Sequence, residues 1–231
     1  MSASASSGTQ KQFRSVNTLA KWVQGTFVVL AILCVIAVIS GYAQAQLLNA
    51  VINGEVITEA EAMANDARQS MIGVMQTLLY IAAGIIFLVW VHRTHSNLPS
   101  LGAIELRFTP GWAVGWFFIP IMSLFRPYQV ASEIWKASDP NVDTTDNVSW
   151  KNVATSPIVG WWWAPFLISN YIGLFAMRMI LRGEELSDLL ASTYAYMVSD
   201  AIDVVGILIT ILMVRRIGQF QEAKNKLISS P

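Results

Sequence analysis

The sequence predicts an all-α integral membrane protein with four transmembrane helices, a proline-bent re-entrant hairpin or short fifth membrane segment, and an interfacial amphipathic helix. Two observations predict this class. First, 54% of the 231 residues are hydrophobic and only 13% are charged, whereas an average soluble domain carries about 25% charged residues. Second, the apolar residues are gathered in runs long enough to cross a bilayer, which takes about 20 helical residues. High hydrophobicity excludes intrinsic disorder, and equal numbers of basic and acidic residues argue against a nucleic-acid-binding protein.

The apolar runs define the expected domain organisation. We expect a disordered cytoplasmic tail over 1–18, a single membrane domain over 19–227 and a short tail over 228–231. The segments expected in the membrane are 22–42, 71–91, 108–125, 152–177 and 189–214. The first run also resembles a secretory signal peptide, because Ala43-Gln44-Ala45 has the small-x-small form of a cleavage site. Its long polar leader and its full spanning length favour an uncleaved first helix.

The run 108–125 is ambiguous between a span and a re-entrant hairpin. It holds Pro110 near its start and Pro120 in its interior, and an interior proline bends or breaks a helix. Basic residues are retained on the cytoplasmic side of a membrane, so their distribution discriminates between the two topologies. A hairpin leaves twelve basic residues inside and only Arg68, Arg178 and Arg182 outside, whereas a crossing leaves seven inside and eight outside. We therefore expect four spans, a hairpin, and cytoplasmic N- and C-termini.

Two connecting segments carry helix signals. Thr58 and Glu61 have the spacing of a capping box, which predicts that a helix begins there and leads into the second span. Pro127 opens an amphipathic stretch over 128–138. We expect this stretch to form a helix at the inner membrane interface, with Glu133 on its polar face and Trp135 as an anchor.

Asp200 and Asp203 are the strongest functional signal, because an ionisable residue within a span costs about 2.5–3.5 kcal/mol on insertion scales. At a spacing of i, i+3 the two carboxylates share one face of the helix. The candidate cations for them are Arg126 and Arg178, and we group these four residues as a candidate intramembrane polar network. Two interpretations stay open, namely a proton or cation site and a structural network that joins helices.

No motif predicts an enzyme or a cofactor. The sequence lacks a phosphate-binding loop, a nucleophile elbow and a zinc-protease motif, and Cys34, as the single cysteine, excludes an internal disulfide. His92 and His95 lie at a spacing that a metal site can use, but we expect them in the headgroup region because no further ligand stands nearby. We expect the tryptophans of 161–163 to have a packing or interfacial role.

Several stretches form a specific pattern. The chain reads WVHRTHSNL over 90–98, PGWAVGWFFIP over 110–120, RPYQV over 126–130 and EIWKAS over 133–138. With the late segment 200–217, this pattern resembles a bacterial family of multi-pass membrane proteins known as domain of unknown function 4328. The positions of this chain that match the family pattern are Arg93, Asn97, Pro120, Arg126, Pro127, Glu133, Asp200 and Asp203. The resemblance implies a bacterial inner-membrane location and no known activity.

The first functional hypothesis is a non-enzymatic membrane protein with a structural or interaction role. The alternative is a small proton- or cation-coupled transporter or ion pathway that uses Asp200 and Asp203 beside the broken hairpin. The expected partners are the lipid bilayer and either a protein partner or a second copy of the chain. We expect no nucleic acid, no metal and no cofactor.

Overall fold

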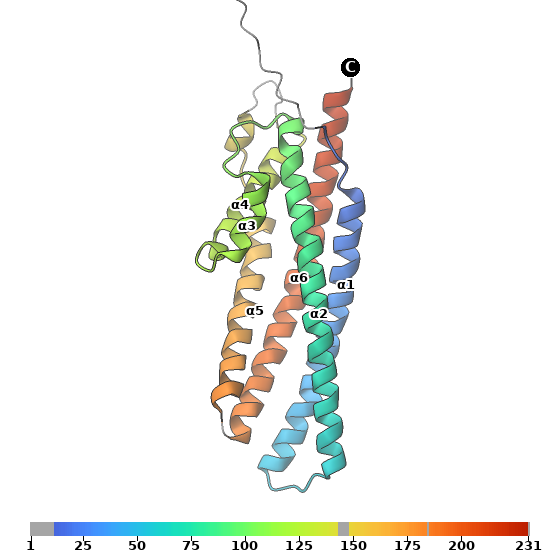
Figure 1. Ribbon diagram of the computed structural model, residues 1–231, viewed down its shortest axis with the longest axis vertical. Helices are drawn as coiled ribbons and strands as arrows, with labels where there is room; N and C mark the ends of the chain where they lie inside the picture. Colours follow the sequence, from blue (N-terminus) through green and yellow to red (C-terminus); the bar gives the residue numbers. More distant parts are fainter. Residues whose placement is uncertain (1–11, 143–147, 184, 231) are drawn as a thin grey trace, which may run out of the picture. The chain divides into compact units, whose positions relative to one another are not determined.

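The computed structural model describes residues 12–142, 148–183 and 185–230, and within these ranges the regular structure is helical, with no strand (Figure 1). The α-helices are α1 (Asn17–Ile52), α2 (Glu59–Asn97), α3 (Pro110–Gly115), α4 (Arg126–Ser138), α5 (Pro157–Arg182) and α6 (Leu186–Ser229). Short 3₁₀ turns cover Leu98–Leu101, Trp116–Phe118, Met122–Leu124 and Ser149–Asn152. Four helices, α1, α2, α5 and α6, are long and apolar enough to cross a membrane. The predicted all-helical class is therefore confirmed for the described residues, together with four candidate membrane-spanning helices.

Several helix ends differ from the expected ranges. Helix α1 begins at Asn17, inside the segment predicted as a tail, and Val16 is fully buried. Residues 1–11 of that tail, residues 143–147 and Pro231 lie outside the described residues. Helix α5 begins only at Pro157, because proline suits the first turn of a helix but disfavours helical geometry in the residue before it.

The predicted capping box forms at the start of α2. The backbone N–H of Thr58 donates to Glu61 Oε2 at 2.8 Å, and the Glu61 N–H donates to Thr58 Oγ1 at 3.2 Å. Two amide groups that a helix start leaves without partners are thus satisfied.

The chain divides into two compact units, and helices α1, α2, α5 and α6 contribute residues to both. Unit 2 consists of Gln24–Ile85 and Gly160–Leu212. Its core joins α1, α2 and α6 through Leu30, Cys34, Ala83 and Ile207. In Figure 1 the turn between α1 and α2 lies at the same end of unit 2 as the adjoining ends of α5 and α6.

Two close approaches hold helices together within unit 2. A Cβ atom on Gly206 of α6 would stand 3.2 Å from the Cβ of Pro165 in α5, and one on Gly41 of α1 would stand 2.7 Å from Met197 Cγ in α6. Small residues at these crossings let apolar helices approach closely, which is how helices commonly pack in membranes. Large apolar side chains such as Ile39, Leu78 and Phe175 are more than half exposed on the outside of the unit, as expected of surfaces that contact lipid.

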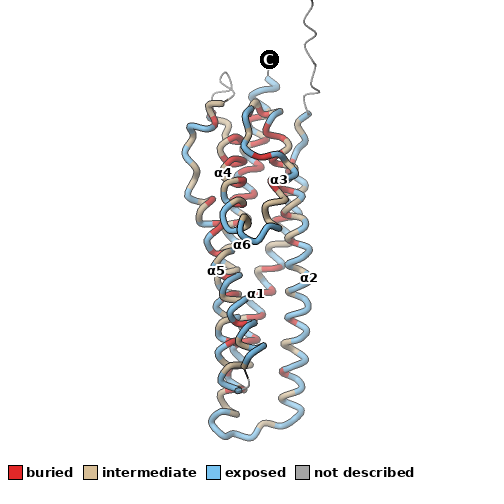
Figure 2. The backbone as a smooth tube through the Cα atoms, turned by 60° about the vertical axis from the view of Figure 1, so that its left-hand side comes forward, coloured by how far each residue is buried: buried red, intermediate tan, exposed pale blue. Residues whose placement is uncertain are grey.

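Unit 1 consists of the described residues of Met1–Val23, Ile86–Val159 and Met213–Pro231. Its core is more completely buried, as Figure 2 shows by colour, and includes Trp90, Leu101, Ile134 and Ile217, each no more than 1% exposed. Trp135 of α4 is 8% exposed and packs edge-on against Phe220 of α6, with ring centroids 5.2 Å apart. Trp135 is therefore a core residue of unit 1 rather than the exposed anchor expected from the sequence.

The ambiguous run 108–125 does not form a continuous helix. Its longest helical piece, α3, has six residues, which rise about 9 Å at 1.5 Å per residue. Irregular backbone and two 3₁₀ turns follow before α4 begins. This segment is thus too short in its helical part to span a bilayer as a helix.

We expect Gly41→Val to destabilise the protein by about 1–3 kcal/mol, because the added methyl groups overpack the α1–α6 crossing at Met197. Gly25→Val is the matched control, since a Cβ at Gly25 meets no atom within 4 Å. Thermal unfolding in detergent micelles measures both variants. Equal unfolding temperatures for the two variants would contradict the close α1–α6 packing.

Candidate functional site

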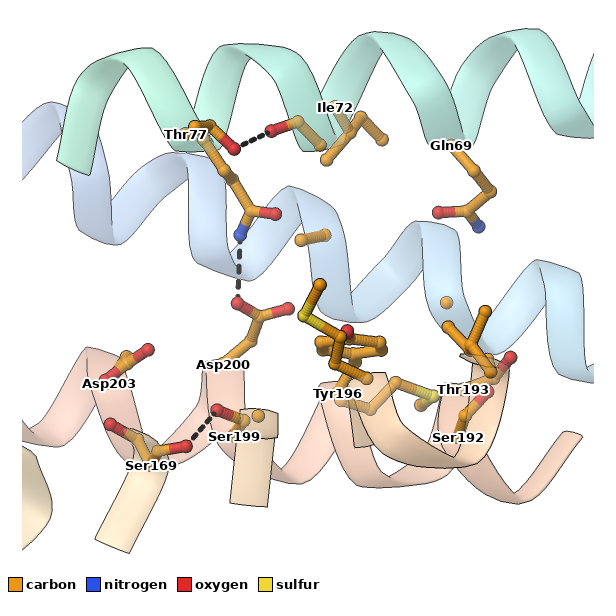
Figure 3. Close-up of a pocket in the computed structure, with 18 of the residues that line it drawn as sticks. Gln69, Ile72, Thr77, Ser169, Ser192, Thr193, Tyr196, Ser199, Asp200 and Asp203 are labelled. Atoms are coloured by element: carbon orange, nitrogen blue, oxygen red, sulfur yellow. Dashed lines mark hydrogen bonds between the residues drawn. The ribbon is translucent and has the colours of Figure 1, made fainter. Parts of the chain in front are cut away.

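A cavity of about 790 Å³ lies within unit 2, and helices α1, α2, α5 and α6 all line it. Figure 3 shows Gln69 and Thr77 on α2 at one side of this space and Asp200, Tyr196 and Thr193 on α6 at the other. The polar residues of its lining are Gln44, Gln69, Gln76, Thr77, Tyr80, Ser169, Asn170, Ser192, Thr193, Tyr196, Ser199, Asp200 and Asp203. A volume of this size is ordinary for a small-molecule site. So many hydroxyl, amide and carboxyl groups are unusual on helices that are otherwise apolar enough to span a membrane.

The two carboxylates of this cavity receive hydrogen bonds from α2. Gln76 Nε2 donates to Asp200 Oδ1 at 2.9 Å, and the Tyr80 hydroxyl donates to Asp203 Oδ2 at 2.6 Å. The donors lie at i, i+4 on α2 and the acceptors at i, i+3 on α6, so one face of each helix presents both groups. The Cys34 thiol of α1 lies 3.4 Å from the Tyr80 hydroxyl and accepts a weaker contact from Gln76 at 3.9 Å.

These partners are neutral, which differs from the arginine partners expected from the sequence. Arg178 is exposed on α5, and among the ion pairs of the described residues none joins it to Asp200 or Asp203. Arg126 belongs to unit 1, where its Nη1 donates to Gln129 at 3.0 Å. The predicted polar network therefore keeps its two carboxylates, but its described hydrogen bonds come from an amide and a phenol.

Other polar groups of the cavity tie the bundle together. Gln44 Nε2 of α1 donates to Thr193 Oγ1 of α6 at 3.2 Å, and Ser199 Oγ of α6 donates to the Ser169 carbonyl of α5 at 2.9 Å (Figure 3). The cavity wall is therefore braced by hydrogen bonds on both sides of α6. Chemically, the arrangement offers two carboxylates and several neutral donors and acceptors to a small polar solute.

A second group of polar residues is buried in unit 1, where Glu133 of α4 meets His95 of α2. His95 Nε2 lies 2.9 Å from Glu133 Oε1, and the two side chains are 0% and 5% exposed. The backbone N–H groups of Arg107 and Phe108 also donate to this carboxylate, at 2.7 and 3.4 Å. One buried carboxylate thus faces two backbone N–H groups and an imidazole, whose other nitrogen, Nδ1, has no hydrogen-bond partner among the described residues. The sequence placed Glu133 on the polar face of its helix and His95 in the headgroup region, whereas the structure buries both side chains against each other.

Gln221 of α6 is the centre of the remaining network of unit 1. Its Nε2 donates to the Thr94 carbonyl at 2.9 Å and to Ser138 Oγ at 3.0 Å, and its Oε1 accepts from Asn97 Nδ2 at 3.0 Å. Asn97 in turn bonds both the N–H and the carbonyl of Arg14, ahead of α1. One buried amide thereby links α6, α2 and α4, and through Asn97 it reaches the segment before α1.

The other family-pattern residues have structural positions in unit 1. Pro127 is buried in the first turn of α4, and Pro120 lies exposed between two 3₁₀ turns. Arg93 is half-buried on α2.

The three adjacent tryptophans of α5 lie within unit 2 and differ in exposure. Trp162 and Trp163 are each 6% exposed and pack against each other, whereas Trp161 is 66% exposed.

Sequence reasoning missed Gln76, Tyr80 and the pairing of His95 with Glu133. Gln76 carried a usable signal, since it is an amide in the middle of the uncharged run 71–91 with a phenol one helical turn later. The His95–Glu133 contact joins residues far apart in the chain, so no local sequence spacing could predict it. Among the residues whose placement is described, no group of three or more His, Cys, Asp and Glu side chains is arranged to hold a metal ion.

We expect Gln221→Leu to destabilise unit 1, because each buried polar group left without its partner costs about 1–3 kcal/mol. Gln219→Leu is the matched control, since Gln219 is exposed on the same helix, and surface changes stay within about 0.5 kcal/mol. Chemical denaturation in detergent measures the difference. Equal midpoints would show that the Gln221 network does not stabilise the fold.

Comparisons with known proteins point to one family. No curated protein and no solved structure matches the chain. A family model described as "Domain of unknown function (DUF4328)" matches residues 53–219, which cover helices α2, α3, α4 and α5 and the part of α6 that carries Asp200 and Asp203. This match covers most of the sequence, including both aspartates of the cavity and the His95–Glu133 pair. The chain therefore belongs to the DUF4328 family, whose function is unknown.

Proposed function

We propose that this protein is a non-enzymatic, multi-pass membrane protein whose unit 2 cavity binds a small cation, and that it acts as a proton- or cation-coupled transporter or ion pathway. The observation that carries the proposal is the pair Asp200 and Asp203 on the cavity wall, held by neutral donors. Gln76 and Tyr80 orient the two carboxylates, but they supply no positive charge.

Electrostatics favours a cation as the occupant of this cavity. Two charged carboxylates on one helix face repel each other, and charged groups within spans are normally paired or functional. No described residue of unit 2 forms an ion pair with either carboxylate. A proton, a metal cation or an organic ammonium group would offset this charge, and the surrounding hydroxyl and amide groups would solvate it.

A structural or interaction role, which was the first hypothesis from the sequence, is the second proposal. It is favoured by the Gln221 network, whose amide directs all of its described hydrogen bonds to neighbouring helices. Under this proposal the Asp200 and Asp203 bonds likewise join α6 to α2, and the protein acts through a partner protein or a second copy.

For location, we propose the bacterial inner membrane with both termini in the cytoplasm. The distribution of basic residues supports this orientation, since a four-span arrangement places only Arg68, Arg178 and Arg182 outside. The end of unit 2 that carries the α1–α2 turn would then face away from the cytoplasm.

We expect Asp200→Asn and Asp203→Asn, alone or combined, to abolish proton or cation flux without unfolding the protein, because asparagine keeps the size and removes the charge. Purified protein is reconstituted into liposomes that contain a pH-sensitive dye, and flux is followed after a pH step with Na⁺ or K⁺ present. Thermal unfolding in detergent is measured in parallel.

Asp66→Asn is the matched control for this experiment, because Asp66 is an exposed carboxylate on α2 and its loss should leave flux intact. A wild-type protein without flux under any ion condition would remove the transport proposal. A collapse of folded yield in the cavity variants, with wild-type flux absent, would favour the structural role.

We expect a green fluorescent protein fused after Pro231 to fluoresce in bacterial cells, because this reporter matures in the cytoplasm and not after export. Fluorescence of the membrane fraction, with immunoblotting for the full-length fusion, is the measurement. A full-length membrane-inserted fusion that stays dark would place the C-terminus outside and contradict the four-span orientation.

A further inference from the structure

We propose that the segment 107–126 of unit 1 is a binding site for anionic phospholipid, in which Arg107 and Arg126 hold the headgroup phosphate and the hairpin 108–125 contacts the acyl chains. The inference rests on exposed apolar side chains beside two arginines without carboxylate partners. It is independent of the cavity in unit 2.

The apolar part of the site is the outer face of the hairpin. Phe118 and Ile121 are 71% and 70% exposed, and Trp112 is 52% exposed. The opposite face is fixed to the unit, since Ala113 is fully buried and the Phe117 ring meets Phe87 edge-on at 6.3 Å. An anchored loop that presents aromatic and branched side chains outward has the composition of a membrane-interface contact.

The cationic part consists of two guanidinium groups around one phenyl ring. Arg107 Cζ lies 5.5 Å and Arg126 Cζ 5.8 Å from the centroid of Phe108. Arg126 also lies over the rings of Trp116 and Phe125, at 5.2 and 5.8 Å. Phe108 therefore brings two positive charges to the base of the exposed hairpin.

The acidic residues near these arginines are engaged elsewhere. Glu105 pairs with Lys151, and the hydrogen bond from Lys151 holds the pKa of Glu105 below its ordinary value. Glu133 accepts the backbone N–H of Arg107 and is shared with His95. Within the described residues of unit 1, no ion pair involves the Arg107 or Arg126 side chain, so both charges are available to an external anion.

Charge complementarity and apolar exposure together select a lipid as the occupant. Arginine binds phosphate oxygens through two parallel N–H donors, and basic residues close to an apolar membrane contact attract anionic lipid. A free phosphate would use the arginines alone and leave Phe118 and Ile121 without a role. A phospholipid uses both halves of the surface at once.

The test is titration of the detergent-purified full-length protein with phosphatidylglycerol and, separately, with phosphatidylcholine of the same acyl chains, followed by native mass spectrometry. We expect tighter binding of phosphatidylglycerol. Arg107→Gln combined with Arg126→Gln should weaken that binding roughly 30-fold, on the usual contribution of a basic residue near a membrane surface, and leave phosphatidylcholine binding unchanged.

Three further variants make the test specific. Arg178→Gln combined with Arg182→Gln removes two exposed arginines from α5 and should leave the phosphatidylglycerol affinity unchanged. Arg107→Gln alone changes an exposed side chain and should give a partial loss, which covers the case in which the Arg126 variant fails to fold. Phe118→Ser combined with Ile121→Ser should weaken both lipids equally.

Four outcomes would overturn the proposal. They are equal affinity of the wild type for the two lipids, an equal loss in the α5 control, displacement of phosphatidylglycerol by millimolar inorganic phosphate, and no loss of phosphatidylglycerol binding in the single Arg107 variant. A wild-type dimer that becomes monomeric in the Phe118 and Ile121 variant, with its lipid preference unchanged, would identify a second copy as the occupant instead.

Discussion

The hydrogen bonds from α2 to the carboxylates of α6 are the interactions on which unit 2 depends. Asp200 and Asp203 are expensive residues for a helix that spans a membrane, and a neighbouring amide and phenol compensate part of that cost. Gln76 and Tyr80 therefore constrain the register between the two helices, since a slide of one turn would separate both pairs. These bonds join the helices but do not neutralise the carboxylates, because both donors are neutral. The cavity therefore contains negative charge without a positively charged partner among the described residues.

Unit 1 also buries polar side chains between its helices, but there they bind one another. Glu133 faces two backbone N–H groups and an imidazole, and Gln221 uses its carbonyl oxygen and both amide protons. Satisfied networks such as that of Gln221 specify one arrangement of their helices, but the buried Nδ1 of His95 and Nε1 of Trp90 have no hydrogen-bond partner among the described residues. Unit 1 thus buries its polar side chains against one another, whereas unit 2 places two carboxylates on the wall of a cavity.

The class of the fold and its four long helices could be predicted from the sequence, because uncharged runs of spanning length leave few alternatives. Asp200 and Asp203 could also be singled out as candidate site residues, since charge within such a run is rare. The hydrogen-bond partners of the two aspartates could not be predicted from the sequence. Opposite charge suggested Arg126 and Arg178, but partner choice depends on which helix packs against α6, and the core that joins α2 to α6 through Ala83 and Ile207 is formed by residues far apart in the chain. The burial of Glu133 was not predicted for the same reason, because the polar and apolar pattern of one helix cannot show that His95 of α2 packs against it.

The position of Cys34 has a practical consequence for studying motion in unit 2. This thiol is fully buried and contacts both Gln76 and Tyr80, the two residues that hold the aspartates. Because the chain contains one cysteine, alkylation kinetics with a maleimide would report the opening of α1 from α2 without any engineered label. The labelling rate relative to that of the unfolded chain converts directly into the free energy of local opening. Cys34 therefore provides a natural reporter of local opening beside the two residues that bind the aspartates.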